Sequence, residues 1–135
     1  MTNDALRLLL IEESDDDACL IARAFSHAGF RPIAKRVSTL PDLAETLADD
    51  VRWDVVMCGT AIPRIELIDA VDLVRQTHGD ALLVALSGRG LAEPPEVSAG
   101  SVDGLLRKDR LEDLPALVNG LMHTFRQSGR PTASA

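Results

Sequence analysis

Five short apolar runs alternate with segments of helical period along this chain, and the pattern predicts an α/β fold. A parallel sheet with helices on both faces fits best, because parallel strands need crossover connections, which are right-handed and usually helical. The length of 135 residues fits one domain with a single core.

The first strand and helix have the clearest boundaries. Residues 6–11 form a nearly continuous apolar run, as expected of a strand covered on both faces. Apolar residues then recur at intervals of three and four over residues 18–28, which predicts an amphipathic helix. Ser14 is expected to cap this helix, the acidic residues 15–17 suit its positive end, and Gly29 suits its stop.

The remaining elements follow the same alternation. Strands are expected at residues 33–37, 55–58, 82–86 and 104–106. Helices are expected at 40–48 after a Ser38 or Thr39 cap, at 66–77, and at about 112–126. Between residues 89 and 99, the adjacent Pro94 and Pro95 leave room for a turn or two of helix at most.

Charge and hydropathy exclude several classes of partner. The 21 acidic and 14 basic side chains give a net charge of −7, which repels nucleic acid and anionic membranes. No apolar run approaches the roughly 20 residues of a membrane span, and the amino terminus lacks a secretion signal, so a cytoplasmic location is expected. Cys19 and Cys58 show no metal-binding spacing and are expected to be buried thiols.

Four polar or glycine sites follow the predicted strands. Glu12 and Glu13 end the first run, Gly59 the third and Ser87 the fourth, and Lys108 follows the fifth. Ligands of parallel α/β sheets bind at the carboxyl ends of the strands, so these residues are expected to converge. They outline a phosphoryl-transfer pocket in which the nucleophile is missing.

On these residues the chain resembles the receiver domain of bacterial response regulators, the CheY-like (flavodoxin-like) fold. The similarity covers about residues 6–125 and is carried by segments 8–18, 53–63, 86–88 and 103–109. It implies a three-layer fold with strand order 2-1-3-4-5. It also implies a Mg²⁺ role for Glu12 and Glu13, a switch hydroxyl at Ser87 and a charge clamp at Lys108.

The chain departs from that family at three places. The phosphoacceptor aspartate is replaced by Gly59, which can form no acyl phosphate and supplies no metal ligand. The switch aromatic is replaced by Leu105, and the fourth helix is shortened or irregular. Glu12 and Glu13 are therefore only weak metal candidates, and no cofactor is expected. Lys108 is expected to pair with Glu12 or Glu13 and hold the pocket in one state.

The leading hypothesis is a non-enzymatic pseudo-receiver in bacterial two-component signalling. It would bind a protein partner, a downstream domain or a second copy of itself. Residues 1–126 would form the domain and 127–135 a linker or disordered tail. The resemblance further implies the head of a larger signalling protein, such as a GGDEF or EAL protein of cyclic-di-GMP signalling.

Two alternatives remain open. The chain could be a phospho-receiver with a displaced acceptor, Asp54 or Ser87, although Asp54 is expected at the far end of its strand. The vacated pocket could instead bind a small molecule or an ion. If the chain dimerises, either the first helix or the last helix with the altered fourth region would form the contact.

Overall fold

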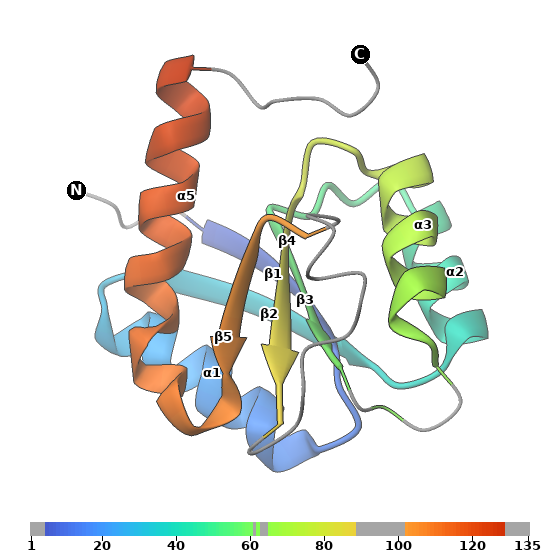
Figure 1. Ribbon diagram of the computed structural model, residues 1–135, viewed down its shortest axis with the longest axis horizontal. Helices are drawn as coiled ribbons and strands as arrows, with labels where there is room; N and C mark the ends of the chain where they lie inside the picture. Colours follow the sequence, from blue (N-terminus) through green and yellow to red (C-terminus); the bar gives the residue numbers. More distant parts are fainter. Residues whose placement is uncertain (1–4, 61, 63–64, 89–101, 129–135) are drawn as a thin grey trace.

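A computed structural model describes residues 5–60, 62, 65–88 and 102–128 of the chain. Its centre is a five-stranded parallel sheet in the order β2-β1-β3-β4-β5 (Figure 1). This is the predicted order, which is thereby confirmed. The strands are β1 (Ala5–Ile11), β2 (Arg31–Val37), β3 (Val55–Gly59), β4 (Leu82–Ser87) and β5 (Gly104–Arg107).

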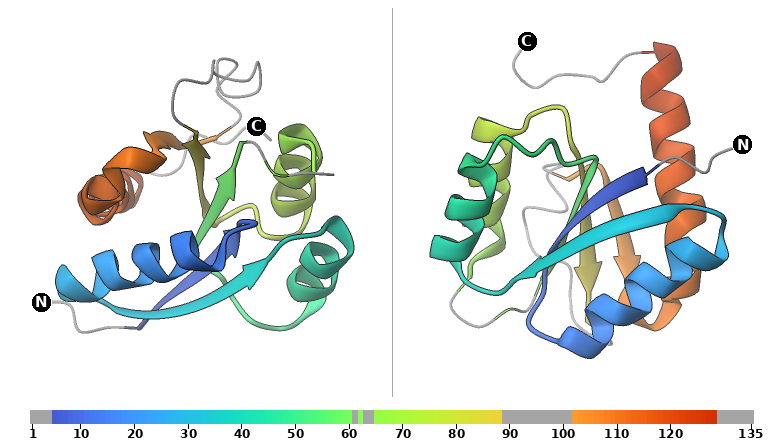
Figure 2. Two further views of the ribbon diagram at one scale, coloured as in Figure 1. Left: turned by 90° about the horizontal axis from the view of Figure 1, so that it is seen from below. Right: turned by 180° about the vertical axis from the view of Figure 1, so that it is seen from behind.

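Helices cover both faces of this sheet. One face carries α1 (Asp15–His27) and α5 (Leu114–Ser128), and the other carries α2 (Leu40–Ala48) and α3 (Leu67–Thr77) (Figure 2). A 3₁₀ segment, η1 (Lys108–Asp113), joins β5 to α5. The predicted irregular helix between residues 89 and 99 lies outside the described residues.

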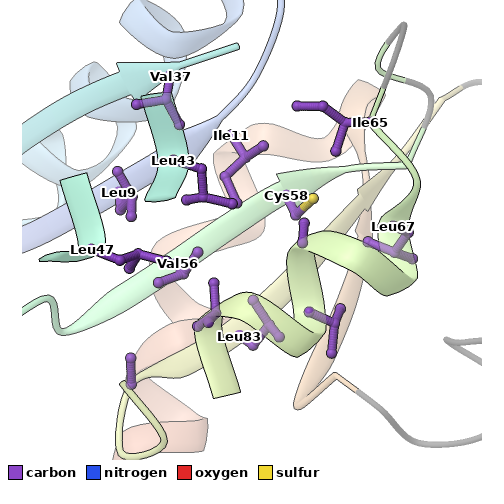
Figure 3. Packing of buried hydrophobic residues seen from close by; sticks show 14 of the residues in the cluster. Leu9, Ile11, Val37, Leu43, Leu47, Val56, Cys58, Ile65, Leu67 and Leu83 are labelled. Carbon is purple, nitrogen blue, oxygen red and sulfur yellow. The ribbon is translucent and has the colours of Figure 1, made fainter. Parts of the chain in front are cut away.

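The alternation of β1 side chains builds two cores. Leu8 and Leu10 pack toward α1 and α5, whereas Leu9 and Ile11 pack toward α2 and α3. Figure 3 shows the second core, where Leu43 of α2 and Leu67 of α3 join strand residues. Both faces of β1 are therefore buried, which is why its sequence reads as an apolar run.

The predicted caps of α1 and α2 are confirmed. The Ser14 hydroxyl accepts a hydrogen bond from the Asp17 amide at 3.1 Å, and Thr39 caps α2 in the same way. After α1 the chain turns at Gly29 with φ of 98°, a left-handed conformation that favours glycine.

Some predicted boundaries differ from those observed. β2 starts two residues early, because Ala5 and Leu6 of β1 pair with Arg31 and Pro32. The helix expected from residue 112 begins at Leu114, since Pro115 is tolerated only in the first turn. It continues to Ser128, so residues 127 and 128 of the expected tail are helical, and the rest of that tail lies outside the described residues.

One prediction about the thiols was wrong. Cys58 is buried, but Cys19 is exposed, because it lies on the side of α1 away from the buried Ala18, Ile21 and Phe25. A separate finding concerns membranes: no helix within the described parts of the chain is long and apolar enough to span one.

Candidate functional site

The register of the sheet brings the predicted site residues to one edge. Ile11 pairs with Cys58, so the next residues, Glu12 and Gly59, follow side by side. Gly59 in turn pairs with Leu86, and Ser87 pairs with Arg107, the residue before Lys108. The four strand ends therefore converge as the sequence predicts.

A buried ion pair occupies the centre of this edge. Glu12 is only 2% exposed, and the Nζ atom of Lys108 donates a hydrogen bond to its Oε2 at 2.9 Å and lies 2.8 Å from its Oε1. The backbone amide of Ser14 donates to the same Oε2 at 3.0 Å. The buried charge of Glu12 is thus neutralised within the protein, and its Oε2 accepts two hydrogen bonds, whereas its Oε1 is in ion-pair contact with Lys108 and has no hydrogen-bond partner among the described residues.

Asp17 is a member of the site that the sequence reading missed. Its Oδ2 lies 3.2 Å from the Nζ of Lys108, across 91 positions of sequence. Burial lowers the pKa of Lys108, but the hydrogen bonds and charges of Glu12 and Asp17 outweigh burial and raise it above its usual value. The position of Asp17 on the first turn of α1, facing the strand ends, was the available signal.

Glu13 does not join this cluster. Its side chain is exposed, and its backbone carbonyl and that of Glu12 accept hydrogen bonds from Nη1 of Arg36 at 3.3 and 3.2 Å. Arg36 also lies 3.4 Å from Asp15 through its Nε. Of the two predicted partners of Lys108, Glu12 therefore forms the ion pair. Arg36 holds the loop at Glu12 and Glu13 through these backbone hydrogen bonds.

The space beside Gly59 is partly filled by its neighbours. A Cβ atom at position 59 would lie 3.3 Å from Oε1 of Glu12 and 3.3 Å from Cγ1 of Ile62. Both distances are tighter than ordinary van der Waals contact, so even an alanine would require a small shift. Glu12 and Ile62 therefore leave little room for a side chain at position 59.

Cys58 lies directly before Gly59 and is fully buried. Burial, with a smaller contribution from the Glu12 charge, raises the pKa of its thiol to about 12. The thiolate is the nucleophilic form of cysteine, so a buried thiol whose pKa is raised in this way is a poor nucleophile at neutral pH.

The other predicted residues take less central places. Ser87 is buried at the end of β4, and among the described residues no hydrogen bond joins its hydroxyl to Glu12 or Lys108. Leu105 is half-buried in β5, paired with Ala85. Asp54 lies at the opposite end of β3, where its Oδ2 accepts the Arg7 amide at 2.8 Å.

The residues at this edge do not fit the magnesium ion that the fold family implies. Lys108 contacts both oxygens of Glu12, Gly59 offers no side-chain oxygen, and Glu13 points into solvent. In the part of the chain that the structure describes, no three acidic, histidine or cysteine side chains are grouped as metal ligands. The ammonium group of Lys108 supplies the positive charge in this cluster.

Several solved structures with the same fold are receiver domains of response regulators. The response regulator receiver protein from Sinorhizobium medicae is 20% identical, with a TM-score of 0.72 over 88% of this chain and 95% of that one. The N-terminal domain of a response regulator/sensory box/GGDEF 3-domain protein from Carboxydothermus hydrogenoformans is 13% identical, with a TM-score of 0.75 over 92% and 99%.

A structure described as an adenylate cyclase from Rhodopirellula baltica is 16% identical, with a TM-score of 0.71 over 90% of each chain. No model of a protein family and no curated protein sequence matches the chain. At these identities the likeness shows the fold alone, which is the CheY-like receiver fold.

Proposed function

Given the receiver fold, we propose that this chain is a pseudo-receiver that acts through protein contact and does not depend on phosphorylation. The observation that carries the proposal is the glycine at the acceptor position, beside Glu12 and at the same sheet edge as Lys108. Receiver chemistry needs a carboxylate there to attack the phosphodonor, and glycine has no side chain.

The charge of the site also opposes phosphoryl chemistry. Two carboxylates, Glu12 and Asp17, surround the one ammonium of Lys108, so this cluster carries a net charge of −1. A phosphodonor brings further negative charge, and no free cation in the cluster is left to receive it. Lys108 neutralises the buried charge of Glu12, so moving the lysine toward a phosphoryl group would leave a buried carboxylate without a cation, which is costly.

We further propose that the domain regulates a larger bacterial signalling protein. The likeness to the N-terminal domain of a three-domain GGDEF protein supports this arrangement, and cyclic-di-GMP signalling is the pathway that the proposal names. The domain would then contribute a binding surface for a protein partner, an output domain or a second copy of itself.

A phosphodonor assay tests the proposal. The chain is incubated with a small phosphodonor and Mg²⁺, beside a receiver domain that retains its aspartate, and intact masses are recorded. We expect the control to gain one phosphoryl group and this chain to remain unchanged. Stoichiometric modification of this chain would overturn the proposal, and mapping in Asp54→Asn and Ser87→Ala variants would then identify the displaced acceptor.

The second candidate function is a small-ligand sensor. One observation favours it, and this observation concerns a cavity outside the candidate site described above. A cavity of about 390 Å³ lies near the amino-terminal edge of the sheet and is lined in part by Trp53 and His78. The Nε1 atom of Trp53 and the Nδ1 atom of His78 are buried without a hydrogen-bond partner among the described residues. A thermal-shift screen with nucleotides and divalent ions tests this candidate, and a Trp53→Phe variant shows whether any hit uses the cavity.

A further inference from the structure

The outer face of α1 carries a stripe of side chains that the candidate site does not use. The stripe consists of exposed residues spaced by three or four positions, namely Asp16, Cys19, Leu20, Arg23 and His27. It lies opposite the buried side of the helix, which packs on the core. Leu20 is 49% exposed, the highest value among the large hydrophobic residues that the structure describes as exposed.

The charges of the stripe are arranged symmetrically about its apolar centre. Asp16 precedes Cys19 by three residues, and Arg23 follows Leu20 by three residues. A two-fold axis passing between Cys19 and Leu20 would therefore set Asp16 of one copy opposite Arg23 of the other, twice. Such a surface is complementary to itself, which is the requirement for an isologous dimer.

Asp16 differs from the two acidic residues beside it in its ion pairing. Asp15 pairs with Arg36 and Asp17 pairs with Lys108, so both are committed within the fold. Asp16 and Arg23, by contrast, have no ion pair with any residue that the structure describes. Both charges are thus available for a partner.

We propose that a second copy of this chain packs on the stripe, with the two α1 helices antiparallel. The inference rests on the proposed function, because contact between copies would then replace phosphorylation as the signal. Antiparallel helices also place opposite dipole ends together, and the 13 residues of α1 give a contact about 20 Å long. A groove of about 320 Å³ between α1 and η1, lined by Leu20, Ala24 and Leu111 among others, adjoins the stripe and adds apolar surface.

Sedimentation velocity of the full 135-residue chain over a range of concentrations tests the proposal. We expect a reversible dimer, and we expect Leu20→Glu to be monomeric because a charge enters the apolar centre. Ile68→Glu is the matched control, since Ile68 is 37% exposed on α3 in the opposite helical layer. A wild-type chain that stays monomeric, or a Leu20→Glu chain that still dimerises, would overturn the proposal.

A charge exchange tests the antiparallel register. Asp16→Arg and Arg23→Asp should each weaken dimerisation by about tenfold, because each places two like-charge pairs in the contact. The double variant should recover most of the loss, since the reversed pair forms twice within one dimer. Double-variant chains that associate no better than the single variants would refute this register, and circular dichroism checks that every variant is folded.

Crosslinking gives a readout that does not depend on charge. Cys19 is exposed and Cys58 is buried, so a short bis-maleimide should join Cys19 of one copy to Cys19 of the other. Cys19→Ser should abolish the covalent dimer, and its absence in wild type would contradict the register. The phosphodonor assay distinguishes failure of the proposed function from failure of this inference. A chain that is phosphorylated and dimerises would refute the proposed function, whereas a chain that is neither phosphorylated nor dimeric would refute only this inference.

Discussion

Lys108 and Glu12 are 96 positions apart in sequence, and the lysine Nζ lies 2.8 Å from one carboxylate oxygen and 2.9 Å from the other. Glu12 is nearly inaccessible to water, whereas Lys108 retains about a quarter of its side-chain exposure. Their contact joins the end of β1 to the start of η1 and fixes the two strand ends relative to each other.

Removing the lysine should destabilise the fold, because Glu12 would stay buried without a cation. We expect Lys108→Met to lower the free energy of unfolding by about 3 kcal/mol, measured by urea denaturation. Arg110→Met is the control, since Arg110 and Asp113 form a surface pair whose loss should cost less than about 1 kcal/mol. A Glu12→Gln change in the Lys108→Met background should restore part of the loss, and no recovery would contradict this account.

An aspartate placed at position 59 should not give the chain phosphoryl-transfer chemistry. Gly59→Asp brings a side chain within 3.3 Å of Glu12 and Ile62 and adds a second negative charge beside a buried one. We expect destabilisation by about 1–3 kcal/mol and no phosphoryl gain in the intact mass. Gly59→Ala adds bulk without charge, so comparing the two variants separates the steric cost from the electrostatic cost. Efficient phosphorylation of the single variant would show that the pocket is open.

Alkaline pH should weaken the fold through Cys58. Its thiol has a pKa of about 12 in the folded protein against an ordinary value of 9.0, so the unfolded chain loses the proton first. The stability contribution is complete below pH 9 and is lost as pH rises toward 12, by at most about 1.4 kcal/mol per pH unit.

Urea midpoints between pH 7 and 10 measure this loss. Cys58→Ala should flatten the profile relative to wild type, and an unchanged slope would contradict the assignment. A thiol reagent at neutral pH should label one cysteine, the exposed Cys19, in the native chain and both after denaturation.

Two glycines should respond oppositely to alanine. A Cβ at Gly104 of β5 would lie 3.0 Å from Leu121, whereas nothing lies within 4 Å of a Cβ at Gly120 of α5. We expect Gly120→Ala to raise the free energy of unfolding by about 0.5–1 kcal/mol and Gly104→Ala to lower it by about 1 kcal/mol or more. Thermal and urea unfolding of the two variants measure the sign of each change in stability. Changes of the same sign in both variants would contradict the surroundings described for Gly104 and Gly120.

The sequence predicted the elements wherever a local signal defined them. The boundaries of α2 agree residue for residue, because Thr39 caps its start and its apolar spacing is regular. The start of α5 was misplaced because the 3₁₀ turn of η1 and an α-helix share the same polar residues, and only Pro115 indicates where the α-helix can begin.

The sequence predicted the composition of the site and one of its contacts, the pairing of Lys108 with Glu12 or Glu13, but not the others. Strand-end positions identified Glu12, Gly59, Ser87 and Lys108, because register alone brings them together. Which of the adjacent Glu12 and Glu13 turns inward depends on the loop that Arg36 holds. The part played by Asp17 and Ile62 depends on tertiary packing, which spacing in one sequence does not reveal.

The cation that balances Glu12 is part of the polypeptide. It cannot be chelated, diluted or exchanged for another ion, so its effective concentration at the carboxylate is set by the backbone and not by the surrounding medium. Chelators therefore have nothing to remove from this pair, and its occupancy should be the same in a magnesium-starved cell as in a replete one.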